Sequence, residues 1–305
     1  MSAVRTAGLT KRYGTVAALE GVDLDVPEGA LFGLVGPNGS GKTTLLETLA
    51  GLRRPSAGTV TLPGPAGVVA YCPDVAEMEP WLTAIEVLDA AVGLLGASRC
   101  RGDLQAALKR VGLADVAGRR VGGFSRGMTT RLNIAAALIG DPAVILIDEP
   151  AAALDPAGRA EILGLVASLA PATTVVVSSH DLADVEAVCD HVGILTGGRL
   201  LYQGPIAQLL ANAATPSWQL VVRPPTEPTL TALGGSCWAA SVEQTRPGEI
   251  EFTSPDPEAV EANLAGLLAG CAARVVSLSP MRPSFEQIFL ALTAKAATSQ
   301  QQDAR

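Results

Sequence analysis

A glycine-rich segment near the N-terminus carries the strongest chemical signal in the sequence. Residues 36–44 fit the phosphate-loop pattern GxxxxGK[ST] without departure. Glycines let backbone N–H groups approach phosphates, and a helix that begins in the loop aims its positive end at the same anion. We expect Lys42 to reach the β- and γ-phosphates of a nucleotide and Thr43 to ligate Mg²⁺. The predicted nucleotide-binding residues are Gly36, Pro37, Asn38, Gly39, Ser40, Gly41, Lys42, Thr43 and Thr44.

Two adjacent carboxylates supply a second element of the same chemistry. The apolar run at residues 144–147 is followed by Asp148 and Glu149. A carboxylate at the end of a buried strand is costly unless it serves a cation or a partner. Asp148 is therefore predicted to hold Mg²⁺, directly or through water, and Glu149 to act as the general base on the attacking water. Apolar strands that end in two acidic residues are common. The functional interpretation of this pair therefore depends on the phosphate loop that precedes it in the sequence.

Short apolar segments must position these residues. Residues 31–35 form an apolar strand that enters the phosphate loop, and residues 42–52 have a helical pattern. Further strands are predicted at 144–147, 174–177 and 192–195, with helices at 162–169 and 181–189 between them. Strands that alternate with helices indicate a mostly parallel sheet covered on both faces, so the fold class is α/β.

The pattern changes near residues 211–217, where we predict a domain boundary, with domains at 1–212 and 213–305. Beyond it, strands are predicted at 218–222, 237–242, 249–253 and 274–278, and helices at 228–233, 257–268 and 284–294. This order resembles a small ferredoxin-like α+β unit.

Composition narrows the class of partner. The net charge of −8 disfavours binding to a phosphate backbone, so no nucleic-acid partner is predicted. No segment reaches the ~18 consecutive apolar residues of a spanning helix, and the first residues lack the apolar core of a secretory signal. The five cysteines form no CxxC pair, which indicates free thiols in a reducing compartment. These features predict a cytoplasmic protein that reaches a membrane only through a partner.

Five residues between the two nucleotide motifs identify a family. Residues 124–128 read Phe-Ser-Arg-Gly-Met. They stand where the ATP-binding subunits of ABC transporters have the signature LSGGQ, and the sequence resembles that family over about residues 1–212. In the family, this signature lies at a helix N-terminus and binds the γ-phosphate of ATP held by the other subunit. Ser125 and Gly127 match the hydroxyl and the close-approach glycine. Phe124, Arg126 and Met128 depart from the pattern. Ser125 also fits a simple helix cap.

Three further positions match the family. Tyr13 fits the aromatic residue that stacks on adenine, and an ordinary tyrosine at a strand end fits as well. Asp155 fits the residue that communicates across the dimer, and an Asp-Pro turn before a helix is the other interpretation. His180 fits the histidine that contacts the γ-phosphate and orients the water, and a histidine at a helix start is the alternative.

One departure changes the charge of the predicted site. The family has a glutamine that links Mg²⁺ to the membrane partner, and here Asp74 takes its place in the stretch Tyr-Cys-Pro-Asp that ends at residue 74. A carboxylate binds Mg²⁺ more strongly than an amide does, but it adds a negative charge near the phosphates. Asp74 is therefore a candidate metal ligand.

The resemblance implies a P-loop NTPase fold of the ABC ATPase type. This fold has a mostly parallel sheet core, an antiparallel β subdomain and an inserted helical subdomain at about residues 74–135. The resemblance also implies hydrolysis of Mg-ATP between two subunits, which form a homodimer or a heterodimer, and an integral-membrane permease as partner.

Residues 283–290, Pro-Ser-Phe-Glu-Gln-Ile-Phe-Leu, resemble an ending found in drug- and antibiotic-exporting systems. The function predicted is therefore ATP-driven export at the cytoplasmic face of the membrane. The alternative is a soluble or regulatory ABC ATPase with weak hydrolysis that is not coupled to transport.

Overall fold

The protein divides into two compact units in the computed structural model, which describes residues 1–62, 69–96, 99–212, 216–281 and 284–303. One unit comprises Met1–Ile206 and Leu292–Arg305, and the other comprises Ala207–Ala291. The predicted boundary between 212 and 213 touches residues outside the described ones. Within the described helices, none combines the length and apolar character needed to cross a membrane.

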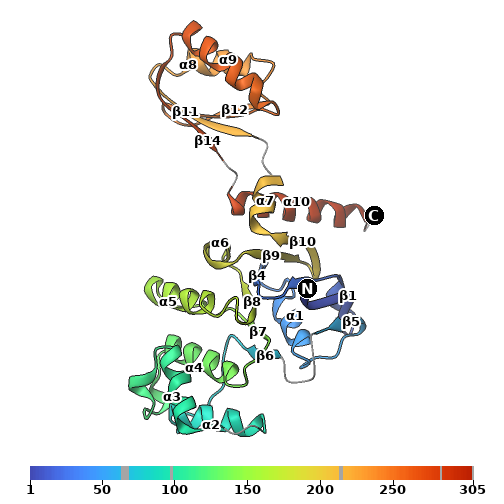
Figure 1. The fold of residues 1–305 in the computed structure, drawn as a ribbon. Helices are drawn as coiled ribbons and strands as arrows, with labels where there is room; N and C mark the ends of the chain where they lie inside the picture. Colours follow the sequence, from blue (N-terminus) through green and yellow to red (C-terminus); the bar gives the residue numbers. More distant parts are fainter. Residues whose placement is uncertain (63–68, 97–98, 213–215, 282–283, 304–305) are drawn as a thin grey trace. The chain divides into compact units, whose positions relative to one another are not determined.

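A six-stranded sheet forms the centre of the first unit (Figure 1). Its order is β10-β9-β4-β8-β7-β6, and every neighbouring pair is parallel except β10 with β9. The strands are β4 (Leu31–Val35), β6 (Val69–Cys72), β7 (Val144–Ile147), β8 (Thr174–Ser179), β9 (His191–Thr196) and β10 (Arg199–Pro205). β4, β7 and β8 are buried along their whole length, as expected of parallel strands covered on both faces. The predicted α/β core is confirmed.

A second, antiparallel sheet packs on this core. Strand β1 pairs with β2, β3 and β5. The strands are β1 (Ser2–Tyr13), β2 (Val16–Val22), β3 (Asp25–Pro27) and β5 (Ala57–Thr61). Residues of both sheets and of α1 (Lys42–Leu49) share one buried apolar cluster that includes Leu9, Phe32 and Leu45. Each such side chain, when fully buried, contributes about 1.5–3 kcal/mol.

Three helices form a group between β6 and β7 in the chain, and Figure 1 shows them lying together. They are α2 (Ala84–Leu94), α3 (Arg101–Arg110) and α4 (Arg126–Leu138), with short 3-10 turns at Ala114–Val116 and Val121–Gly123. Thr83 begins α2 with a reciprocal cap, in which the Glu86 carboxylate accepts from the Thr83 N–H at 2.8 Å. Helices α5 (Pro156–Ala167), α6 (Leu182–Val188) and α7 (Ile206–Asn212) complete the order up to residue 212.

Between Ser217 and Met281, the second unit forms a four-stranded antiparallel sheet with two helices. Its chain order is β-α-β-β-α-β and its strand order is β12-β13-β11-β14. The elements are β11 (Ser217–Arg223), α8 (Glu227–Gly234), β12 (Ser241–Arg246), β13 (Glu249–Thr253), α9 (Pro257–Gly270) and β14 (Arg274–Met281). Phe252 centres its core, stacked on Trp218 at 5.4 Å with Trp238 against its edge at 5.9 Å. The last helix of the chain is α10 (Phe285–Asp303).

Three predicted elements are wrong in their bounds by more than three residues at one end or at both, and one of them, the helix predicted at 284–294, continues to Asp303. The strand predicted at 237–242 is β12, Ser241–Arg246, because Trp238 is used for packing on Phe252 while the exposed edge strand is polar. The helix predicted at 162–169 begins earlier, at Pro156. Proline is favoured at the first helical position, and Asp155 caps this end by accepting from the Gly158 N–H at 2.9 Å.

Candidate functional site

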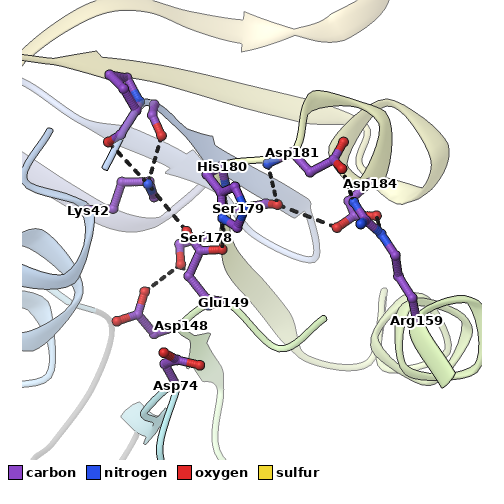
Figure 2. Close-up of polar contacts among 12 residues, drawn as sticks. Lys42, Asp74, Asp148, Glu149, Arg159, Ser178, Ser179, His180, Asp181 and Asp184 are labelled. Atoms are coloured by element: carbon purple, nitrogen blue, oxygen red, sulfur yellow. Dashed lines mark hydrogen bonds and ion pairs between the residues drawn. The ribbon is translucent and has the colours of Figure 1, made fainter. Parts of the chain in front are cut away.

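The predicted catalytic residues meet at one edge of the parallel sheet. Strands β4, β6, β7 and β8 run in the same direction, so the segments that follow them leave at the same edge. Those segments carry Lys42, Asp74, Asp148, Glu149 and His180 (Figure 2). The sheet therefore brings together residues that lie more than 100 positions apart in sequence.

The phosphate loop (residues 36–44) has the geometry of an anion cradle. Gly39 and Gly41 have φ values of 78° and 107°, a region that side chains disfavour. Helix α1 begins after Gly41, and no side chain of the described residues caps it, which leaves its first N–H groups for another acceptor. The Ser40 hydroxyl is buried and has no hydrogen-bond partner in the part of the chain that the structure describes. Buried polar groups are normally paired, so this hydroxyl indicates a missing ligand.

The Lys42 side chain is fixed by contacts with the phosphate loop and with Glu149. Its side chain is 6% exposed, and the ammonium group donates to the carbonyls of Gly36 at 2.7 Å and Pro37 at 3.4 Å. It also forms an ion pair with Glu149 at 3.3 Å. The lysine charge is thus already oriented toward the cavity above the loop.

Asp148 is a buried carboxylate tied to the next strand. It is 3% exposed, and its Oδ1 accepts a hydrogen bond from the Ser178 hydroxyl at 2.5 Å. Burial raises the pKa of Asp148 above its usual value, while hydrogen bonds from Ser178 and Thr43 act in the opposite direction. The charged carboxylate is therefore costly here until a cation approaches it.

Asp148→Asn is expected to stabilise the fold at neutral pH. Because the folded-state pKa of Asp148 is raised, folded protein holds this proton more tightly than unfolded chain does, and stability falls as pH rises above the unfolded pKa. An amide avoids that loss. We therefore expect the Tm at pH 7 to rise by a few degrees, since 1 kcal/mol of stability shifts the Tm by about 2–4 °C. The gain should vanish in acid, where Asp148 is protonated, and calorimetry across pH measures it.

Asp103→Asn provides a control of opposite sign. Hydrogen bonds from the backbone and side chain of Cys100 lower the pKa of Asp103, so loss of this carboxylate should lower the Tm at pH 7. An Asp148→Asn protein that is less stable than wild type at pH 7 would contradict the prediction.

Glu149 has a strained backbone and three polar partners. Its φ of 46° lies in the left-handed region, which non-glycine residues rarely adopt outside functional sites. The backbone N–H donates to the Ser178 hydroxyl at 2.9 Å, which compensates for the strain. The carboxylate lies between Lys42 at 3.3 Å and the His180 ring nitrogen Nδ1 at 2.7 Å. Figure 2 shows these contacts around Glu149.

A cavity of about 480 Å³ opens above the phosphate loop. Seven of the predicted loop residues line it, from Asn38 to Thr44. Asp74, Glu149 and His180 line the same cavity. Groups that are predicted to contact phosphate, hold metal and activate water therefore face one space.

The predicted signature residues lie elsewhere on the same unit. They line a separate cavity of about 570 Å³ with Asp155, and the predicted members are Ser125, Arg126, Gly127 and Met128. Ser125 caps α4 by accepting from the Met128 N–H at 3.3 Å. The cap interpretation of Ser125 therefore holds in the structure, and Asp155 directly precedes α5 and caps it, with Pro156 as the first helical residue. Among the described residues, a Cβ on Gly127 would meet only Leu154, at 3.8 Å, so packing within the subunit does not require a glycine there.

Tyr13 lies at the end of β1 and is 43% exposed. The Lys11 ammonium is 5.2 Å and the Arg53 guanidinium 5.6 Å from the centre of its ring. Tyr13 is not among the described residues that line the 480 Å³ cavity, so its adenine-stacking role stays a prediction.

Sequence reasoning missed two supporting contacts. Ser178 bonds both Asp148 and Glu149, and its signal was a hydroxyl at the carboxyl end of an apolar strand. Arg159 on α5 forms ion pairs with Asp181 and Asp184, on either side of the start of α6 (Figure 2). These pairs connect the helix that Asp155 caps to the segment that carries His180.

The donor set fits Mg²⁺ held together with a nucleotide. Across the residues described by the structure, no group of three His, Cys, Asp or Glu side chains is arranged to hold a metal ion. Magnesium in nucleotide sites is usually held by one or two carboxylates and by the substrate phosphates. Asp148 and Thr43, which lines the cavity, supply the oxygen ligands that this arrangement needs.

The fold and this cavity define a P-loop nucleotide-binding protein. A family model described as ABC transporter matches residues 19–152. The uncharacterised ABC transporter ATP-binding protein YxlF of Bacillus subtilis is 34% identical over 291 residues, which are 92% of this chain and 96% of that protein. The daunorubicin resistance ATP-binding protein DrrA3 of Streptomyces coeruleorubidus is 33% identical, and the match covers 96% of both chains. The chain therefore belongs to the ATP-binding proteins of ABC transporters.

A solved structure supports the same fold. It is the dimeric, post-hydrolysis state of the ATP-binding cassette MJ0796 bound to ADP and Pi, with a TM-score of 0.59 and 26% identity. The match covers 67% of this chain and 98% of that one. The predicted family and the predicted ABC ATPase fold are confirmed.

Proposed function

We propose that this ABC ATPase hydrolyses Mg-ATP between two subunits and thereby drives export through a separate membrane permease. The observation that carries the proposal is the separation of its two sets of predicted residues. The phosphate loop and the hydrolytic residues line one cavity, and the signature residues line another. A second subunit is needed to bring a signature to each phosphate loop, which agrees with the dimeric state of the MJ0796 cassette.

Each residue has a role that its position supports. Lys42 binds the β- and γ-phosphates, and the loop N–H groups and the start of α1 bind the remaining phosphate charge. Mg²⁺, when bound at Thr43 and Asp148, neutralises phosphate charge. Glu149 accepts the proton of the attacking water, and His180 orients both that water and the Glu149 carboxylate, which it contacts at 2.7 Å. The partner's signature closes the site and excludes bulk water.

Transport requires a partner that spans the membrane. The group α2–α4 is the predicted docking surface for a permease. It carries the signature at the start of α4, so pairing of two subunits through the signature would move this group and the permease bound to it. The direction of transport is inferred from DrrA3, which is named for daunorubicin resistance. These considerations support a position at the cytoplasmic face of the membrane. Glu149 and His180 both face the phosphate loop, which argues against a subunit that only binds ATP.

Gly127→Arg is expected to separate nucleotide binding from turnover. The new side chain would occupy the signature surface, so Mg-ATP should no longer bring two subunits together, and the ATPase rate should fall about 100-fold. Affinity of the single subunit for ADP should stay within about twofold of wild type, because Gly127 does not line the phosphate-loop cavity. Calorimetry with ADP, light scattering with Mg-ATP and a steady-state ATPase assay give the three values.

Gly164→Arg is the matched control. Gly164 lies on α5, is exposed, and has no atom of the described residues within 4 Å of the position of a Cβ. It should retain both pairing and hydrolysis. If Gly127→Arg weakens ADP binding as much as it slows turnover, the signature acts within its own subunit and the shared site is wrong.

A further inference from the structure

The two charged departures from the family pattern contact each other. Asp74 stands where the family has glutamine, and Arg126 stands in the signature segment. In the structure, the Arg126 guanidinium nitrogen Nη2 donates to Asp74 Oδ1 at 2.6 Å. The residues are 52 positions apart, so local sequence does not account for the meeting. One substitution supplies a negative charge and the other supplies the positive charge that neutralises it.

The ion pair is part of a larger connection between the end of β6 and helix α4. Asn133 lies two turns after Arg126 and therefore on the same face of α4. Its side-chain amide donates to the Pro73 carbonyl at 3.3 Å, and the Cys72 thiol donates to the Asn133 carbonyl at 3.7 Å. Three consecutive residues, 72–74, thus bond to this helix.

The pair also lies between the two cavities. Asp74 lines the phosphate-loop cavity, and Arg126 lines the signature cavity. Figure 2 shows Asp74 on the side of Asp148. The carboxylates of Asp74 and Glu149 both line the cavity where phosphates must bind, and Lys42 pairs with Glu149 there. Arg126 adds positive charge from outside this cavity.

We propose that Arg126 is a positioning residue that holds and neutralises Asp74, so that the signature helix sets the charge at the metal-facing edge of its own nucleotide site. The inference rests on the proposed nucleotide site, but not on pairing of subunits. Both side chains are 41% exposed, so the pair by itself adds little to fold stability. Its effect is on the anion bound beside it. Without Arg126, the free carboxylate repels phosphates and attracts a cation.

A double-mutant cycle on ADP binding tests this role in the full-length protein. ADP affinity is measured by calorimetry in EDTA and again in excess Mg²⁺. Arg126→Ala should weaken metal-free binding about threefold to tenfold and Mg-ADP binding less, because Mg²⁺ compensates for the free Asp74. Asp74→Gln should strengthen metal-free binding. In the Asp74→Gln background, Arg126→Ala should change affinity by less than about twofold, since no carboxylate remains to be neutralised.

Two further variants exclude a general effect of surface charge. Arg126→Lys keeps the charge and should recover most of the metal-free affinity. Arg131→Ala removes an arginine from the same helix that pairs with Glu161 instead, and it should leave ADP affinity unchanged. The Arg126→Ala effect should also shrink as salt is raised, as expected of partly exposed charges.

The proposal is overturned if Arg126→Ala has the same effect in the wild-type protein and in the Asp74→Gln background. It is also overturned if Arg126→Ala leaves metal-free ADP binding unchanged and abolishes only pairing with Mg-ATP. That second result would assign Arg126 to the partner's phosphates. A protein that binds ADP but never pairs would refute the shared site proposed above, while this cycle on single subunits would still give its answer.

Discussion

Glu149→Gln is expected to bind ATP and to lose hydrolysis by about 10²- to 10⁴-fold. The amide has the shape of the carboxylate but cannot accept the proton of the attacking water. It also carries no charge to hold Lys42, which is 3.3 Å from Glu149. The lysine is then free for phosphate, so affinity for ATP should rise rather than fall. A steady-state assay and equilibrium binding of ATP measure the two effects.

The same variant should accumulate closed dimers. If hydrolysis is what removes the contacts between phosphate and signature, then a subunit that cannot hydrolyse ATP stays paired once Mg-ATP is bound. Light scattering of the variant should give twice the subunit mass with Mg-ATP, and the mass of one subunit with Mg-ADP.

Glu20→Gln is the control for loss of a carboxylate. Glu20 is about half exposed, pairs with Arg199 at 3.1 Å and is not among the described residues that line the cavity. It should keep the ATPase rate of wild type. Turnover at the wild-type rate in Glu149→Gln would remove Glu149 from the role of general base and leave His180 or a backbone group to activate water.

The site residues that could be predicted best from the sequence are those whose pattern lies within one short, continuous segment. The phosphate loop is one continuous segment whose glycine φ values and uncapped helix start are set by neighbours in sequence. Asp148 and Glu149 follow a buried strand, and parallel pairing then carries them to the same edge as the loop. Strand order within a covered sheet follows from general rules, so this part of the site could be anticipated from the pattern alone.

Contacts between distant segments could not be predicted in this way. Ser178 looks like the end of an ordinary strand, and only the β7–β8 register places its hydroxyl between Asp148 and Glu149. Arg126 was recognised as a departure from the signature, but its partner Asp74 comes from another segment. In the second unit, Trp238 drew the predicted strand toward residue 237, whereas its ring is used at the edge of Phe252. An apolar side chain predicts that its residue is buried, but it does not predict whether that residue belongs to a strand, a helix or a turn.

Lys42→Met is expected to weaken nucleotide binding strongly. Methionine preserves much of the buried stem but removes the ammonium group, which already donates to two loop carbonyls and faces the cavity. A hydrogen bond to a charged group contributes about 1.5–3 kcal/mol, and every 1.4 kcal/mol is tenfold in affinity, so ADP binding should weaken about 10- to 100-fold. ATP should be affected more, because Lys42 is assigned to the γ-phosphate as well as the β-phosphate.

Loss of the Lys42 charge also leaves the Glu149 carboxylate, 15% exposed, without its cation. Part of any defect in Lys42→Met is therefore repulsion between Glu149 and phosphate. The double variant Lys42→Met, Glu149→Gln removes that repulsion and should recover some ADP affinity, but not that of Glu149→Gln alone. Lys109→Met, on the exposed side of α3, is the control and should bind ADP as wild type does. Equal ADP affinity in Lys42→Met and wild type, with the fold intact by circular dichroism, would show that phosphate binds somewhere other than this loop.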